Sequence, residues 1–361
     1  MKRDNSTAKA HSLEVSKELG DKAIRLTARL GLLRNDLQVR SSNGFLHIPL
    51  KQEPLPSHTE ELKKELPQSK VLVEVFSRRA EPSRTAIDLV KDRLPPHLLA
   101  SFPRAIDFVG DIAITEIPPE LQEQKRLIGE MILEAHKHVR TVLAKSGAVS
   151  GVYRVREYEV IAGSRNTETV HKEHGCKYHL DLRKVYFSPR LSYEHMRVAS
   201  QVKENETVVD MFAGVGPFSI LIAKTHLNVK VYAVDANPDA VRYLQRNTTV
   251  NRVVGKVVPV LGDAGEVIRE RLLGTADRVI MNLPERAVDY LGMACEALNP
   301  GGGVMHYYDF ACGSDALETV KSRLAETLGR EGRNVEESLS ERLVREVAPF
   351  KWQVAVDVRV R

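Results

Sequence analysis

The chain has 361 residues, enough for two or three domains, and 42% of them are hydrophobic while 28% are charged. No apolar run approaches the roughly 20 residues that cross a bilayer, and no apolar core follows the polar N-terminus, so we expect neither a membrane span nor a secretory signal. The three cysteines lie far apart in the sequence, so we expect a cytoplasmic protein with neither a disulfide framework nor a metal site.

The net charge of +5 is unevenly distributed along the chain. Residues 1–200 contain 33 Lys and Arg against 26 Asp and Glu, whereas the rest of the chain contains 20 against 22. A basic region beside a neutral one suits a polyanionic partner such as RNA, although an ordinary solvated surface gives the same excess.

Residues 1–52 predict a small α+β module. Residues 20–33 carry apolar side chains at helical spacing, and residues 39–50 predict a hairpin around an Asn-Gly turn. Residues 53–70 are rich in charge and proline, which predicts a linker. Because so short a module has little core, we expect it to be an appended, mobile binding module.

Residues 71–200 predict a second α+β region. An apolar run over residues 71–76 favours a strand, and residues 121–143 carry apolar side chains on one helical face, which predicts a long amphipathic helix. Alternating residues over 151–182 predict a meander of strands.

Residues 201–361 predict a doubly wound α/β domain. Four β-rich runs end in the polar residues Asp210, Asp235, Asp263 and Asn282. The carboxyl ends of parallel strands meet in the crevice where such sheets bind ligands, although Asp235 and Asp263 could instead cap the helices that follow. The alternating run over residues 352–360 predicts an antiparallel edge strand.

A glycine turn follows the first of these strands. The sequence Asp210-Met-Phe-Ala-Gly-Val-Gly216 precedes an apolar helix, an arrangement that places backbone N–H groups around a nucleoside-bearing ligand. Ser219 stands where a dinucleotide-binding turn has its third glycine, so the turn resembles motif I of class I S-adenosylmethionine-dependent methyltransferases. Asp235 lies about 20 residues further on, as a ribose-binding carboxylate does.

Four motifs occur in order: YRVRE at 153–157, YFSPRLSYE at 186–194, DMFAGVGPFS at 210–219 and NLP at 282–284. This series resembles the tRNA (guanine-37-N1)-methyltransferases of archaea and eukaryotes, over nearly the whole chain. The resemblance implies a class I methyltransferase sheet, preceded by an α+β RNA-binding region and a small N-terminal module that contacts the outer corner of tRNA. It also implies S-adenosyl-L-methionine as cofactor, tRNA as partner, and a monomer without an obligate protein partner.

Methylation of N1 of guanine requires removal of the N1 proton, so a general base is needed. Glu194 is the candidate, although a carboxylate at a helix N-terminus also has a structural explanation. A guanidinium could stabilise the charge that develops on O6, and the sequence leaves open whether Arg154 or Arg156 faces the base.

The resemblance assigns the base to Glu194 and the O6 contact to Arg154. His195 stands where archaeal members commonly have Arg, which leaves its mode of cofactor contact open. The implied cofactor-binding residues are His195, Asp210, Phe212, Gly214, Asp235, Ala236, Asp263, Ala264 and Asn282. The implied substrate-binding residues are Tyr186, Arg190, Asn282 and Pro284.

The NLP motif favours a ring nitrogen as the methyl acceptor. Enzymes that methylate exocyclic amines often carry Asn/Asp-Pro-Pro and an aromatic residue, whereas Leu283 and Glu285 stand in those places here. The alternatives are a sister wybutosine-pathway transferase, which moves the aminocarboxypropyl group or methylates a wyosine precursor, an NAD-dependent oxidoreductase, and a catalytically silent RNA-binding protein.

Overall fold

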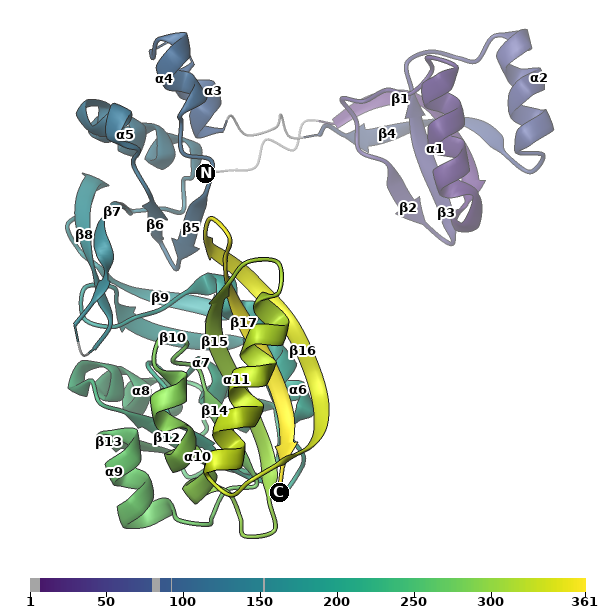
Figure 1. Cartoon of the computed structure of the whole chain (residues 1–361). Coiled ribbons are helices and arrows are strands. Elements are labelled where there is room, and N and C mark those ends of the chain that lie inside the picture. The colour runs from purple at the N-terminus through teal and green to yellow at the C-terminus, as the bar shows by residue number, and fades with distance from the viewer. Residues whose placement is uncertain (1–6, 80–84, 92, 152) are drawn as a thin grey trace. The chain divides into compact units, whose positions relative to one another are not determined.

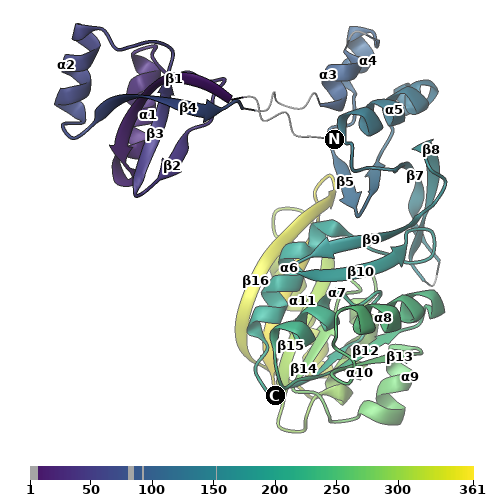
Figure 2. The same ribbon diagram turned by 180° about the vertical axis from the view of Figure 1, so that it is seen from behind.

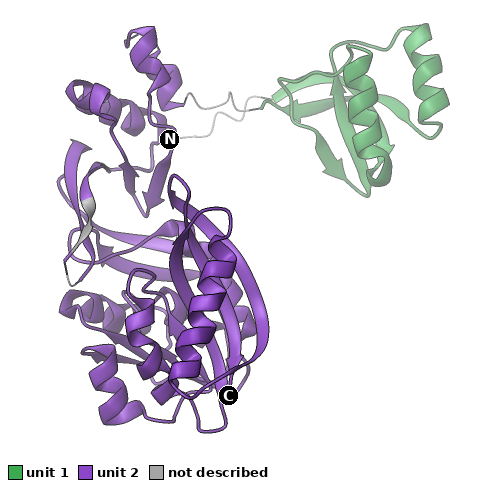
Figure 3. Cartoon of the chain, viewed as in Figure 1, with its two compact units in different colours: residues 1–83 green, residues 84–361 purple. Residues whose placement is uncertain are grey.

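The structure, a computed structural model, describes residues 7–79, 85–91, 93–151 and 153–361. The chain forms two compact units, residues 1–83 and residues 84–361 (Figure 3). Each unit is described by itself. Within the described ranges, no helix combines the length and the apolar character that a bilayer crossing requires.

The first unit is an antiparallel sheet in the order β2-β3-β1-β4, packed against two helices. The predicted hairpin is confirmed, because Asn43 and Gly44 between β2 and β3 have φ angles of 48° and 85°, as a type I′ turn requires. The elements are β1 (Thr7–Ser16), α1 (Gly20–Arg29), β2 (Arg40–Ser42), β3 (Phe45–Leu50), α2 (Pro56–Glu65) and β4 (Lys70–Ser77).

The predicted boundary of this unit was wrong. Residues 53–70 do not form a linker, because Pro56 begins α2 and the buried Leu62 and Leu66 fill the core beside the sheet. Residues 71–76 do not open the second region either, because β4 pairs along the length of β1. The leucines at helical spacing within a charged stretch are what attach α2 to the sheet.

The second unit begins with a mixed sheet in the order β5-β6-β7-β8, covered by α5. The long helix predicted over residues 121–143 was wrong: α5 ends at Ala135, and Thr141 begins β7, which pairs in parallel with β6. β-branched residues at 139, 141 and 142 favour the strand. The elements are α3 (Ala86–Val90), α4 (Pro96–Ala100), β5 (Ile106–Val109), β6 (Ile112–Thr115), α5 (Lys125–Ala135), β7 (Thr141–Ser150), β8 (Val155–Gly163), β9 (Glu168–Glu173) and β10 (Cys176–Asp181).

The centre of the second unit is a seven-stranded sheet in the order β13-β12-β11-β14-β15-β17-β16. The strands from β13 to β15 are parallel, while β17 runs antiparallel to both of its neighbours. The prediction that residues 352–360 form an edge strand was wrong in one respect, because β16 pairs with the outer side of β17 and is itself the edge strand, as Figure 2 shows. The strands are β11 (Thr207–Asp210), β12 (Lys230–Asp235), β13 (Val257–Leu261), β14 (Arg278–Met281), β15 (Gly303–Cys312), β16 (Val335–Ala348) and β17 (Lys351–Val360).

Helices cover both faces of this sheet (Figure 1). Val208 and Ile280 pack on one face, and their neighbours Val209 and Val279 pack on the other, as the alternation of strand side chains requires. The first face carries α6 (Ser192–Gln201), α7 (Pro217–Thr225), α8 (Pro238–Val250) and the β9–β10 hairpin. The second carries α9 (Ala264–Val267), α10 (Leu291–Ala297) and α11 (Ala316–Arg330). The predicted doubly wound α/β fold is confirmed.

Candidate active site

A cavity of about 270 Å³ opens at the carboxyl ends of β11, β12 and β14. Residues 212–215, 235–237 and 282–286, which follow these three strands, form one side of it. Further lining residues come from the segment that leads into α6 and from the C-terminal strands. The fold therefore brings the predicted motifs together at the edge where open α/β sheets bind ligands.

The glycine turn after β11 is shaped by its backbone. Gly214 and Gly216 have φ angles of 55° and 91°, and a Cβ at Gly216 would collide with Leu244. The N–H of Gly214 donates a 2.7 Å hydrogen bond to Oδ2 of Asp235. This bond ties the turn to the end of β12.

Asp235 lies in the cavity with its carboxylate fixed in place. Its Oδ1 accepts a 2.8 Å hydrogen bond from the N–H of Asn237, and burial raises the pKa of the carboxyl group. Each oxygen binds one backbone donor and retains a lone pair that a ligand hydroxyl could use. Ala236, beside it, also lines the cavity.

The other two predicted aspartates lie outside the cavity lining. Asp210 is fully buried and accepts a 2.6 Å hydrogen bond from the hydroxyl of Ser219, and burial raises its pKa to about 7. Asp263 caps the N-terminus of α9 through the N–H of Gly265 at 2.9 Å, and Ala264 follows it in the helix. Asp263 also accepts a 3.0 Å hydrogen bond from Tyr290, which does line the cavity.

Arg154 and Arg156 have different surroundings. Arg154 lines the cavity, just before β8, and forms an ion pair with Glu285. Arg156 donates a 2.9 Å hydrogen bond to the carbonyl of Gly147 instead. Among the predicted substrate residues, Tyr186, Asn282 and Pro284 line the cavity, whereas Arg190 forms a 2.6 Å ion pair with Asp107 outside it.

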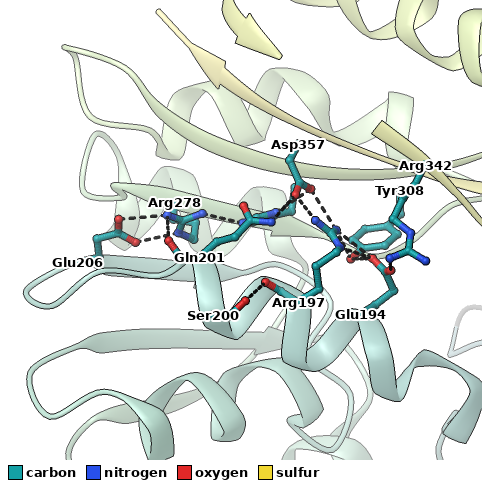
Figure 4. Close-up of polar contacts among 10 residues, drawn as sticks. Glu194, Arg197, Ser200, Gln201, Glu206, Arg278, Tyr308, Arg342 and Asp357 are labelled. Atoms are coloured by element: carbon teal, nitrogen blue, oxygen red, sulfur yellow. Dashed lines mark hydrogen bonds and ion pairs between the residues drawn. The ribbon is translucent and has the colours of Figure 1, made fainter. Parts of the chain in front are cut away.

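Glu194 is buried on the first turn of α6, with 1% of its side chain exposed (Figure 4). Its Oε2 accepts hydrogen bonds from the hydroxyl of Tyr308 at 2.8 Å and from Nε of Arg197 at 3.0 Å. Its Oε1 lies 3.1 Å from Nη1 of Arg342. The next residue, His195, lines the cavity, while the Glu194 carboxylate points toward Tyr308 on β15 and Arg342 on β16 and lies outside the lining.

A chain of buried polar groups extends from Glu194 across the sheet (Figure 4). Arg197 pairs with Asp357, whose other oxygen lies 2.8 Å from Nδ1 of His306. Nε2 of His306 faces Nη1 of Arg278 at 2.8 Å, and a guanidinium can only donate, so the single proton of the neutral imidazole sits on Nδ1. Burial opposes ionisation of Asp357, but His306 and Arg197 hold the pKa of Asp357 below its usual range.

Tyr308 and His195 are held by carboxylates. Burial and the nearby charge of Glu194 raise the pKa of Tyr308, so the hydroxyl stays protonated and donates. Nδ1 of His195 lies 2.7 Å from Oε1 of Glu173, and the imidazole meets the ring of Phe218 edge-on at 4.6 Å. Burial opposes the charge of Glu173, but His171 and His195 lower its pKa to about 2.

Several residues of the cavity could not be predicted from the sequence motifs. Arg345 on β16 and Gln353 on β17 line it, although both lie more than 150 residues beyond the YFSPR segment that they face. Ser188 and Tyr290 also line it. The alternation of β17 was the only available signal, because it placed Gln353 on one face with Ala355 and Asp357.

The chain resembles known proteins over almost all of its length. Residues 169–336 match the model of the TRM5/TYW2 methyltransferase domain, and residues 87–167 match that of the TYW2 N-terminal domain. The tRNA (guanine(37)-N(1))-methyltransferase Trm5b of Pyrococcus abyssi is 40% identical over 349 residues, which are 97% of this chain and 98% of the relative.

Solved structures agree with this relationship. The crystal structure of wild-type Trm5b from Pyrococcus abyssi has a TM-score of 0.72 at 38% identity, and the match covers 97% of this chain and 99% of that one. The complex of aTrm5 with tRNALeu has a TM-score of 0.66 at 30% identity, and the match covers 96% and 99% of the two chains. The chain therefore belongs to the TRM5/TYW2 family of methyltransferases.

Proposed function

We propose that this protein transfers a methyl group from S-adenosyl-L-methionine to N1 of guanosine 37 in tRNA. One observation carries the proposal: a single cavity is lined by the motif I turn with Asp235 and by Arg154, Asn282 and Pro284. The residues that we assign to the cofactor and those that we assign to the base thus line the same cavity. The full-length similarity to a guanosine-37 methyltransferase supports the same reaction.

The residues of the first side fit a nucleoside cofactor. Asp235 has lone pairs left for the hydroxyls of a ribose. Phe212 and Tyr290, whose rings meet edge-on at 5.0 Å, offer an apolar wall to an adenine. When bound, S-adenosyl-L-methionine supplies an electrophilic methyl group.

Arg154 is suited to hold the target base. The Arg154 side chain is 23% exposed in the cavity wall, and the side chain of its ion-pair partner Glu285 is 48% exposed. Because an ion pair with an exposed carboxylate contributes little free energy, a base carbonyl can replace Glu285 at modest cost. We assign to Arg154 the hydrogen bond to O6, where negative charge develops as the N1 proton leaves. Pro284 and Tyr186 would bound the base on either side.

Glu194 would accept the N1 proton. An N1–C bond would form as the N1–H bond and the sulfur–methyl bond of the bound cofactor break, so that the proton ends on the carboxylate and S-adenosylhomocysteine is released. Oε2 is held by the buried Tyr308 and Arg197, whereas the guanidinium of Arg342 at Oε1 is 31% exposed. Arg342 is thus the partner that can withdraw, and its withdrawal would give N1 access to Oε1.

The partner of this reaction would be tRNA, with the first unit as an additional recognition module. The basic excess of residues 1–200 supports this assignment. The target base would have to leave the anticodon-loop stack to enter the cavity. We propose that the enzyme acts as a monomer in the cytoplasm.

The test uses purified protein, S-adenosyl-L-methionine labelled separately in the methyl and carboxyl groups, and tRNA transcripts with guanosine or adenosine at position 37. We expect methyl label in N1-methylguanosine from the guanosine transcript alone. Glu194→Gln should lose most of this activity while it retains tRNA binding, and Glu130→Gln on the exposed face of α5 serves as the matched control. Transfer of the carboxyl label would identify the alternative, aminocarboxypropyl transfer in the wybutosine pathway.

A further inference from the structure

Arg345 and Gln353 face each other across the β16–β17 hairpin and both line the cavity. Gln353 is buried, with 1% of its surface exposed. Neither residue belongs to a motif of the sequence, and the reaction proposed above assigns neither a role. Their hydrogen bonds connect the YFSPR segment to the NLP segment.

The guanidinium of Arg345 is fixed by three acceptors. Its Nε donates to Oε1 of Gln353 at 2.9 Å, Nη1 donates to the hydroxyl of Ser188 at 2.9 Å, and Nη2 donates to the hydroxyl of Tyr186 at 3.3 Å. Because a guanidinium has no acceptor, the atom of Gln353 that faces it must be the amide oxygen. The orientation of the Gln353 amide is therefore determined by Arg345.

This orientation determines that of Asn282. The Nε2 of Gln353 points away from Arg345 and donates to Oδ1 of Asn282 at 3.4 Å. The Asn282 carbonyl is thus turned toward the protein. Its Nδ2 has no hydrogen-bond partner among the described residues, and Asn282 lines the cavity. Asn282 consequently offers a donor to a ligand in the cavity.

We propose that Arg345 and Gln353 are positioning residues that set the base specificity of the enzyme through Asn282. An amide that offers a donor selects a base carbonyl, such as O6 of guanine, and disfavours an exocyclic amine, such as N6 of adenine. Sites that modify exocyclic amines need the opposite orientation, with the carbonyl facing the base. This role rests on the proposed methylation of guanosine 37.

The variant Gln353→Glu tests the hydrogen bond from Gln353 to Asn282 most directly. It is nearly isosteric and still accepts from Arg345, but its carboxylate cannot donate to Asn282. Asn282 must then turn its Nδ2 toward Glu at position 353 and its carbonyl toward the base. We expect the single-turnover rate on the guanosine-37 transcript to fall by about tenfold or more, with the Kd for tRNA and the Kd for S-adenosylhomocysteine within about twofold of wild type.

A double-mutant cycle distinguishes this role from a merely structural one. If Gln353 acts through Asn282, the losses caused by Gln353→Glu and Asn282→Ala will not add, and the double variant will be within about threefold of the slower single variant. Arg345→Lys keeps the positive charge but cannot make the three hydrogen bonds of the guanidinium. We therefore expect its single-turnover rate to lie between those of the wild type and Gln353→Glu. Gln245→Glu on α8 is the matched control and should leave the rate unchanged.

The outcomes separate the two proposals. Additive losses, or a Gln353→Glu variant with a wild-type rate, would overturn the positioning role while the methylation stands. A wild-type protein that does not methylate guanosine 37 would overturn the proposed function and this role with it. A competition assay adds a second readout: the adenosine-37 transcript should inhibit Gln353→Glu several-fold better, relative to the guanosine-37 transcript, than it inhibits the wild type.

Discussion

The hydroxyl of Tyr308 donates a 2.8 Å hydrogen bond to Oε2 of Glu194, and both side chains are buried. Tyr308 lies on β15 of the central sheet, and Glu194 lies on α6, a helix that covers one face of that sheet. The bond fixes Oε2 of Glu194, the candidate base, whereas Oε1 pairs with the partly exposed guanidinium of Arg342.

Tyr308→Phe removes this donor and keeps the aromatic ring. We expect the single-turnover rate to fall by about tenfold because the carboxylate loses its fixed orientation, with tRNA affinity unchanged. We also expect about 1–2 kcal/mol of lost stability. The control is Tyr307→Phe, the next residue, whose hydroxyl binds Asp309 on the other face of β15. It should lose similar stability and keep the rate; equal rate losses would contradict the role of Tyr308.

The two arginines that contact Glu194 should differ in their effect on folding. Arg197 is 11% exposed and balances both Glu194 and Asp357, so Arg197→Gln leaves two buried carboxylates and should cost about 3–5 kcal/mol. Arg342 is partly exposed and stacks on Tyr193, so Arg342→Gln should cost at most about 1 kcal/mol.

Urea unfolding followed by fluorescence measures this difference. The single tryptophan, Trp352, lies on β17 in the second unit, so its emission reports on that unit alone. If Arg197→Gln and Arg342→Gln lower the free energy of unfolding equally, the difference in burial between the two arginines does not determine their contribution to stability.

The raised pKa of Asp210 should be visible in the pH dependence of the free energy of unfolding. Burial raises the folded pKa of Asp210 from 3.8 to about 7, so the group supports folding fully below pH 3.8 and this contribution is lost as the pH rises through 7. Asp210→Asn lacks the ionisation and keeps an acceptor for Ser219. Its stability relative to wild type should therefore increase between about pH 4 and pH 7, by roughly 2–4 kcal/mol, and level off above.

This prediction is checked by unfolding both proteins at pH 5, 6, 7 and 8. The exposed variant Asp289→Asn provides the baseline, and its difference from wild type should not follow the same curve. A difference between Asp210→Asn and wild type that stays constant from pH 5 to pH 8 would rule out the raised pKa.

Asp235→Asn should weaken cofactor binding. The Asp235 carboxylate accepts hydrogen bonds from two backbone N–H groups. An Asn side chain in its place would point its own NH2 group at one of these two donors, and that hydrogen bond would be lost. Isothermal titration with S-adenosylhomocysteine should show a loss of about tenfold or more. Asp239→Asn, in the first turn of α8 and paired with an exposed arginine, is the control. Unchanged affinity in Asp235→Asn would exclude a ribose contact.

Features of this protein that depend on local pattern were predictable from the amino-acid sequence. Strands that end in Asp210, Asp235 and Asn282, and a glycine turn with positive φ, were readable because each needs only its immediate neighbours. The parallel order of these strands then placed their ends together. The hairpin at Asn43-Gly44 was readable for the same reason.

Local pattern failed where neighbouring elements decided the outcome. Residues 53–70 look like a linker until Leu62 and Leu66 meet the core of the first unit. The helical spacing over residues 121–143 continues past Ala135, yet pairing with β6 converts the rest into β7. Residues 352–360 alternate like an edge strand, but β16 pairs with their outer side.

The site divides in the same way. Motifs identified Arg154, Glu194, Asp235 and Asn282, but only the tertiary structure placed Arg345 and Gln353 beside them and surrounded Glu194 with Tyr308, Arg197 and Arg342. Tyr308 and Arg342 each lie more than 100 positions from Glu194 in the sequence, and Gln353 contacts Asn282 from 71 positions away. A sequence specifies the chemical groups of a site, whereas the direction of each hydrogen bond depends on which distant groups the folded sheet brings within reach.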